Sequence, residues 1–496
     1  MTLDTVFASV VPAILSVLPG YLSELSDESS LRLNAVDHLV TQTIEAVRSA
    51  MWDAIRTYWK RRAEQVAAYC PTCGHKCERE ERTIAVTVSG QSVPITSVYF
   101  YCRPCHRGNA PLANWLGLCR GKTSIQFERH LVALSTEMSF HQAGGQMGEQ
   151  HGQIVDAGKA ERVTYSVARD AVIFLQERHA AVKALFEGPK VPTGVNTMLV
   201  TTDGGGAPVG ELFRPPPVLA VKLTPKRHLP QGEREQTHRE MRLIVAHALP
   251  HEHGERRSID VHVAPLEHPE VSGDRMLATA RLAGMGMSTH VHGVFDGGSW
   301  IKPQFIRVFG NVPHSICLDK PHVIEYLGDA SKALFPTDGQ PNAEMRRAQE
   351  KAQREWLTVA RKNLQDGTWA TLVQNLKVST AEDVVAARKY VENHHEDMPY
   401  SQYEAAGLPV GSGEAEGGIR HEIRARFDNA GVWREDHLSP MGALESIRGS
   451  GWWDEFWTWR EERDIQAFRA RQRGENPRTF RGRTKSSASE EKKKTA

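Results

Sequence analysis

The chain of 496 residues lacks a long uncharged apolar run, since no segment reaches the roughly 18 residues that a membrane-spanning helix needs. The apolar stretch from Val6 to Leu18 has no basic start and is interrupted by Pro12, which favours an ordinary helix over a signal peptide. The formal net charge is only +1, so contacts with nucleic acid would require local basic patches. These absences predict a soluble cytoplasmic protein without membrane partners.

Cysteine is also scarce, with seven residues in the chain, but four of them form two Cys-x-x-Cys pairs. The pairs are Cys70/Cys73 and Cys102/Cys105. Between them, β-branched residues alternate on either side of Ser89-Gly90, which predicts a β-hairpin. Four thiolates beside a hairpin can surround zinc tetrahedrally and leave no open position, so we predict a structural Zn²⁺. His75 or Cys77 could replace one of the four ligands.

Three carboxylates occupy positions that indicate a shared site. From residue 196 the chain alternates predicted strands and helices, and two of the strands end at Asp203 and Asp296, each followed by glycine. Far downstream, a Gly-Ser-Gly loop leads into a predicted helix that carries Glu416. An aspartate before glycine is also a common turn residue, so the evidence is the layout and not the single residue. Carboxylates at the carboxyl ends of strands lie where open α/β sheets build their sites.

This layout is that of a ribonuclease H-like site, in which three carboxylates bind two metal ions about 4 Å apart. Oxygen ligands favour Mg²⁺ or Mn²⁺. On a helix, Arg420 and Arg424 share a face with Glu416 and can hold phosphates. Asp319 and His322 follow another predicted strand and could brace the site or contact the scissile phosphate, the alternative being a hydrogen-bonded turn histidine.

The order of these motifs resembles the ISKra-type insertion-sequence transposases, DDE enzymes related to the Mutator group. The resemblance covers most of residues 66–460. Its parts are the two cysteine pairs, Asp203-Gly204, Asp296-Gly297-Gly298-Ser299-Trp300-Ile301, Asp319-x-x-His322, Leu408-Pro409-Val410-Gly411-Ser412-Gly413-x-x-Glu416-Gly417 and Gly451-x-Trp453-Asp454-x-Phe456-Trp457.

The resemblance implies that Asp203, Asp296 and Glu416, rather than Glu414, are catalytic and bind magnesium. It also implies binding to double-stranded DNA, both at the terminal inverted repeats of the element and at target DNA, by a homo-oligomer in a bacterial, nucleoid-associated setting. Two other functions fit the same residues: a non-catalytic, domesticated DNA-binding regulator, and a metal-dependent nuclease without strand transfer.

Together these patterns predict a multidomain α+β protein. Its predicted regions are N-terminal helices (1–66), a zinc ribbon (67–120), a helical DNA-binding region that could contain a helix-turn-helix (121–190), a ribonuclease H-like α/β catalytic domain (191–460) with a helical insertion at about 335–400, and a disordered basic tail (461–496).

Overall fold

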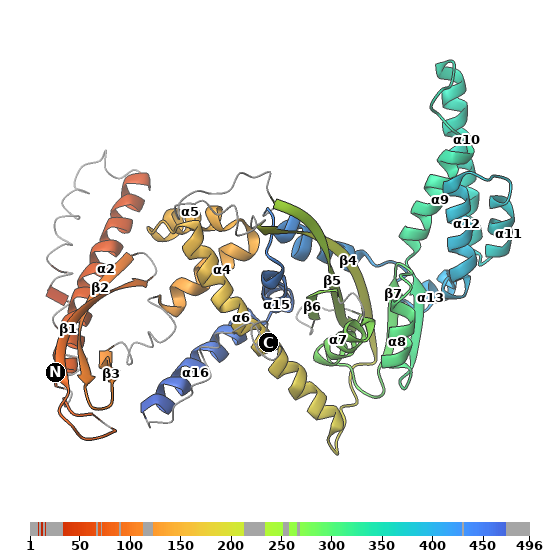
Figure 1. Ribbon diagram of the computed structural model, residues 1–496. Coiled ribbons are helices and arrows are strands. Elements are labelled where there is room, and N and C mark those ends of the chain that lie inside the picture. The colour runs from red at the N-terminus through yellow and green to blue at the C-terminus, as the bar shows by residue number, and fades with distance from the viewer. Residues whose placement is uncertain are drawn as a thin grey trace, which may run out of the picture. The chain divides into compact units, whose positions relative to one another are not determined.

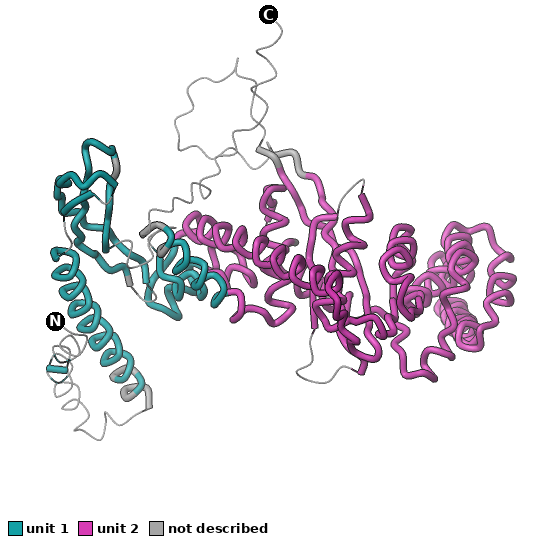
Figure 2. The backbone as a smooth tube through the Cα atoms, turned by 90° about the horizontal axis from the view of Figure 1, so that it is seen from below, with its two compact units in different colours: residues 1–131, 144–155, 457–496 teal, residues 132–143, 156–456 magenta. Residues whose placement is uncertain are grey.

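The computed structural model describes residues 8, 11–12, 15, 33–65, 68–70, 72–88, 91–112, 123–212, 234–250, 257–264, 268–428 and 431–472. The chain divides into two compact units, coloured teal and magenta in Figure 2. Unit 1 comprises residues 1–131, 144–155 and 457–496, and unit 2 comprises residues 132–143 and 156–456. Within the described ranges, no helix combines the length and apolar character of a membrane span.

Unit 1 contains a long helix and a small antiparallel sheet in the order β1-β2-β3. Its elements are α2 (Leu33–Glu64), β1 (Glu78–Val88), β2 (Gln91–Cys102) and β3 (Arg107–Asn109). The predicted hairpin is confirmed, and Ile84 lies opposite Ile95 in it. Buried hairpin residues such as Val86 and Ile95 pack with Ala63 of α2 and against its Trp59. Because one core joins the helix to the hairpin, the zinc-ribbon segment does not depend on metal alone for burial.

Residues 123–190, all of which the structure describes, form three helices, as the sequence predicts for this region. They are α4 (Ile125–Glu137), α5 (Phe140–His151) and α6 (Ala157–Glu187). The start of α6 is fixed by Asp156, whose side chain accepts a hydrogen bond from the backbone N–H of Lys159.

Unit 2 is built around a mixed sheet in the order β6-β5-β4-β7-β8. The strands are β4 (Thr197–Leu212), β5 (Arg234–Leu249), β6 (Arg257–Val263), β7 (His290–Phe295) and β8 (His314–Leu318). β4, β7 and β8 run parallel, whereas β5 is antiparallel to both of its neighbours. Parallel neighbours require crossover connections. Here these contain α7 (Pro269–Leu282), between β6 and β7, and α8 (Ile301–Phe309), between β7 and β8.

Alternate residues of β4 face opposite sides of the sheet, as the period of a strand requires. Met198 and Val200 pack in one cluster with Phe305 of α8. Leu199 points to the other side, where it packs with Val384 in a second cluster. Helices therefore cover both faces of this sheet.

The second cluster is supplied largely by helices that follow β8 and lie beside β7 and β8 (Figure 1). They are α9 (Lys320–Leu334), α10 (Ala343–Gln365), α11 (Trp369–Leu376) and α12 (Glu382–His394), followed by the 3₁₀ turn η4 (His395–Asp397) and α13 (Tyr400–Ala405). The helical character predicted for residues 335–400 is thus observed.

The C-terminal part consists of helices, and one of them corrects the predicted tail. These helices are α14 (Gly413–Gly418), the π-helix η5 (Ile419–Asp428), α15 (Glu435–Gly449) and α16 (Trp453–Gln472). The prediction of disorder from residue 461 is wrong for residues 461–472, because α16 is anchored by buried Trp457 and by an ion pair of 2.5 Å between buried Arg460 and Glu128. The rest of the predicted tail, residues 473–496, lies outside the described residues.

Candidate functional sites

Asp203 lies within β4 and not at its end, which corrects the predicted strand boundary. Pairing of β4 with β7 stops at Thr201, but pairing with β5 continues to Leu212 and keeps the strand extended. Asp203 therefore lies just beyond the parallel part of the sheet. Asp296 directly follows the last residue of β7. Both predicted aspartates consequently lie at the same edge, where the parallel pairing of β4 and β7 ends.

Glycines allow the helix that carries Glu416 to approach this edge. A Cβ atom on Gly418 would lie 2.3 Å from Leu243 Cδ2 of β5, so only glycine fits there without displacing its neighbour. A Cβ on Gly205 of β4 would lie 3.0 Å from Ile423 Cγ2 of η5. The glycines of β4 after Asp203 thus let the helical segment of α14 and η5 pack closely against the strand. This packing brings Glu416 of α14 close to the sheet edge.

The three carboxylates are electrostatic neighbours. Burial raises the pKa of Asp203, and the charges of Asp296 and Glu416 raise it further, while the N–H of Gly204 partly offsets these effects. Asp203 and Asp296 also line one pocket of about 490 Å³. The carboxylates are too widely spaced to share one metal ion: among the described residues, no three carboxylate or imidazole ligand atoms lie within 4.8 Å of one another.

Asp319 is a buried brace for the loop that starts α14. It is 2% exposed and accepts two hydrogen bonds from Ser412, from the backbone N–H at 3.1 Å and from the hydroxyl at 2.8 Å. Burial raises the pKa of Asp319, the bonds from Ser412 lower it, and the charge of Glu416 raises it. Of the two roles predicted for this aspartate, bracing matches its position.

His322 lies in the first turn of α9 and is partly exposed. The imidazole acts electrostatically to lower the pKa of both Asp203 and Asp319, which places it near each of them. The ring lies edge-on to Tyr390, with centroids 5.9 Å apart, and the Tyr390 hydroxyl donates to the backbone oxygen of Asp296. His322 is thus part of the environment of the carboxylates and could contact a ligand there.

The two glutamates of α14 have different surroundings. Glu414 Oε2 lies 2.8 Å from Nε2 of His247, a buried residue of β5, so this side chain ties α14 to the sheet. Glu416 is exposed and forms no ion pair with any residue that the structure describes. Glu416 is therefore the carboxylate of the pair that remains available to a ligand.

The predicted arginines follow Glu416 on a π-helix and not on the α-helix that the sequence spacing suggests. The wider π turn changes the angular relation among positions four residues apart. Arg420 and Arg424 are nevertheless exposed, and neither has a carboxylate partner in the described part of the chain. Both cations are available for phosphates.

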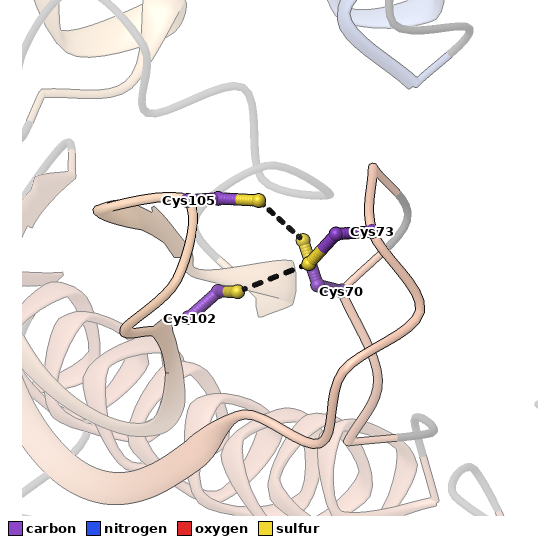
Figure 3. A group of neighbouring side chains, drawn as sticks. All are labelled: Cys70, Cys73, Cys102 and Cys105. Carbon is purple, nitrogen blue, oxygen red and sulfur yellow. Dashed lines mark hydrogen bonds between the residues drawn. The ribbon is translucent and has the colours of Figure 1, made fainter.

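The four predicted zinc ligands converge in unit 1 (Figure 3). Their sulfur atoms all lie within 4.8 Å of one another, with 3.9 Å between Cys70 and Cys105 and 3.5 Å between Cys73 and Cys102. Four sulfurs about 2.3 Å from a tetrahedral ion would be separated by about 3.8 Å. Cys77 lies outside this group. The cluster could hold a metal ion such as zinc.

Backbone hydrogen bonds favour thiolates in the first Cys-x-x-Cys turn. The N–H of Thr72 lowers the pKa of Cys70, and the N–H of His75 lowers the pKa of Cys73 to about 6. His75 therefore contributes mainly through its backbone, and its side chain adds a smaller hydrogen bond to Cys73.

From the sequence, His292 is not predicted to belong to the site, because no carboxylate or cysteine stands at ligand spacing from it. The side chain is fully buried in β7, with Nδ1 2.8 Å from Ser315 Oγ and Nε2 2.8 Å from the Pro409 carbonyl oxygen. It therefore fixes the segment just before the Gly411-Ser412-Gly413 loop. A histidine at an inward position of a β-strand, where burial demands hydrogen-bond partners, was the available signal.

Compared with protein-family models and with curated proteins, the chain matches none.

Proposed function

We propose that the protein is a DDE-type DNA transposase with a ribonuclease H-like catalytic domain. The observation that carries the proposal is that Asp203, Asp296 and Glu416, which are far apart in sequence, lie as electrostatic neighbours at one sheet edge. The sheet supports it: three parallel strands flanked by an antiparallel pair, with helices on both faces, are the arrangement expected of a ribonuclease H-like domain.

The carboxylates fit a pair of Mg²⁺ or Mn²⁺ ions by the chemistry of their oxygens. In a two-metal site the ions stand about 4 Å apart, so the outer carboxylates need not lie as close together as the ligands of one ion. Burial is the main cause of the raised pKa of Asp203, and repulsion from Asp296 and Glu416 adds to it; a bound cation would relieve that repulsion. Asp203 and Asp296 would contact the ions, and Glu416 would complete the shell from the helix.

When bound, the ions would supply activation of the attacking oxygen and stabilisation of the leaving oxygen. The chain's own contribution is positioning. Asp319 and Ser412 hold the start of α14, and Glu414 ties that helix to the sheet. Arg420 and Arg424 would hold DNA phosphates beside the carboxylates.

We further propose that the cysteine cluster binds a structural Zn²⁺ that rigidifies the hairpin of unit 1. Exposed basic residues on this frame, among them Arg79, Arg82 and Arg103, would contact DNA phosphates and position the protein without reading sequence.

The decisive experiment compares two glutamates two positions apart. With Mg²⁺ and DNA taken from the flanks of the gene, Glu416→Gln should reduce strand cleavage at least about a hundredfold. Glu414→Gln keeps the size of the side chain at the His247 contact and leaves all three carboxylates in place, so it should cleave far faster than Glu416→Gln. Both variants should bind the DNA as the unchanged protein does. Equal activity in the two variants would exclude Glu416 from the reaction.

The open spacing of the carboxylates also fits a non-catalytic regulator on the same scaffold. A regulator would bind the flanking DNA but leave it uncut in Mg²⁺ and in Mn²⁺. A nuclease would cut the DNA without joining the freed 3′ ends to a target. Following the products on a target plasmid therefore separates all three functions.

A further inference from the structure

The pocket beside the carboxylates extends past them along β5. Residues 238, 240 and 242 alternate along this strand and so point to one face of the sheet, where all three line the pocket. The opposite part of β4 is the glycine stretch 204–206, which has no side chains to fill the space. The loop from Asp296 to Ile301 supplies further lining residues. The result is a groove that runs from Asp203 and Asp296 along bare backbone.

Arg242 is the fixed cation of this groove. It is 7% exposed, and its Nε donates to Glu240 and its Nη1 to Ser272, both at 2.9 Å. The guanidinium also lies over the ring of Trp300, 4.0 Å from the centroid. Its Nη2 donates to no residue that the structure describes. The side chain is thus held in one orientation, while one of its donor nitrogens has no acceptor among the described residues.

A buried polar chain behind Arg242 explains its fixed position. Ser272 Oγ, which accepts from Arg242, lies 2.9 Å from His262 Nε2, and His262 Nδ1 lies 2.7 Å from Asp260 Oδ1. Burial alone would raise the pKa of Asp260, but Arg275 and His262 bring it well below its usual value, so the carboxylate is charged.

This serine, histidine and aspartate have the connectivity of a hydrolase triad, but Ser272 is 0% exposed and cannot meet a substrate. The hydrogen-bond chain that begins at the charged Asp260 therefore positions Arg242 and does not activate a nucleophile.

We propose that this groove is a phosphate subsite for a single DNA strand and that Arg242 binds a phosphodiester next to the one at the carboxylates. The inference rests on the proposed function and names a further binding residue for it. Arginine suits this role because its planar fork matches phosphate oxygens. Arg239 also lines the pocket, but its Nε is paired with Glu435 at 2.9 Å, so Arg242 is the cation that faces the groove. Glu240 and the two aspartates oppose an anion there. Binding at Arg242 consequently competes with Glu240 and is favoured once divalent ions neutralise the aspartates.

The test measures binding of a short single-stranded oligodeoxynucleotide to the full chain in Ca²⁺, which is expected to replace Mg²⁺ without supporting cleavage. Arg242→Gln should weaken binding about tenfold, as expected for the loss of a charge-assisted hydrogen bond. It should also reduce the slope of log affinity against log salt by about 0.7, the value for one phosphate contact on a single strand. Arg434→Gln, an exposed arginine paired with Asp436 and outside the groove, is the matched control and should change neither quantity.

Arg242→Lys keeps a cation near Trp300 and decides the matter if Arg242→Gln fails to fold. It should weaken binding less than Arg242→Gln would, because a lysine lacks the fork. Unchanged affinity in Arg242→Lys, or an equal loss in Arg434→Gln, would overturn the subsite.

Measuring strand cleavage alongside oligonucleotide binding distinguishes a failure of the Arg242 subsite from a failure of the proposed function. Normal strand cleavage together with binding that is insensitive to Arg242 overturns the subsite alone. Arg242-dependent binding in a protein that never cuts DNA overturns the proposed chemistry alone. Competition by inorganic phosphate, without any Arg242-dependent binding of the oligonucleotide, would identify a free-anion site and also overturn the proposal.

Discussion

Replacing Ser412 by alanine tests the brace that positions Glu416. The change removes the hydroxyl that donates to Asp319 at 2.8 Å, in a contact where the serine is 6% and the aspartate 2% exposed. A hydrogen bond to a charged group contributes about 1.5–3 kcal/mol. Burial already raises the pKa of Asp319, so the folded protein can lessen the loss by protonating it. We therefore expect the free energy of unfolding to fall by about 1.5 kcal/mol at neutral pH.

The sign of the pH dependence follows from the same contact. The lost donor stabilised the charged carboxylate, so the penalty should be largest where Asp319 is ionised and should shrink as the pH falls and the group protonates. Urea unfolding at neutral and at acidic pH, followed by circular dichroism, measures both values.

Two controls decide whether the reasoning holds. Ser401→Ala removes an exposed hydroxyl on α13 and should leave stability within about 0.5 kcal/mol. In the background of Asp319→Asn, the effect of Ser412→Ala should become smaller, since the charged acceptor is already gone. A loss below about 0.5 kcal/mol for Ser412→Ala, or the same loss with and without the charged aspartate, would refute the brace.

Three other outcomes follow. Asp203→Asn should raise the free energy of unfolding of the metal-free protein at neutral pH, and urea titrations should show the gain vanishing below the ordinary pKa near 3.8, because a raised folded-state pKa makes stability fall as pH rises. Cys102→Ser should release about one zinc ion per chain in metal analysis, whereas Cys77→Ser should retain it, and metal loss from the second variant would contradict the observed grouping. Arg460→Met should destabilise unit 1 by about 3–5 kcal/mol in thermal or urea melts, since it leaves Glu128 buried without its charged partner; a loss under about 1 kcal/mol would contradict this.

Local patterns predicted a large part of the fold. The hairpin between the cysteine pairs, the strand ending before Asp296 and the helical stretch after residue 342 all appear as expected, because their residue periodicity is a property of neighbouring positions. The β4 boundary was wrong because the extension to Leu212 depends on pairing with β5, a partner more than twenty residues away. The predicted start of the disordered tail at residue 461 was wrong, because Arg460 of α16 pairs with Glu128, which is far away in the sequence.

The sequence by itself determined which residue types could form sites: thiolates at metal spacing, and carboxylates at the ends of strands. Only the tertiary structure decided how each is used. Glu414 and Glu416 are chemically equivalent in the sequence, but one meets His247 and the other faces solvent. Arg242 gave no signal at all in the sequence, because its orientation comes from a serine thirty residues away and from the ring of Trp300. A motif specifies chemistry locally, whereas burial and hydrogen-bond partners arise from contacts that span the whole chain.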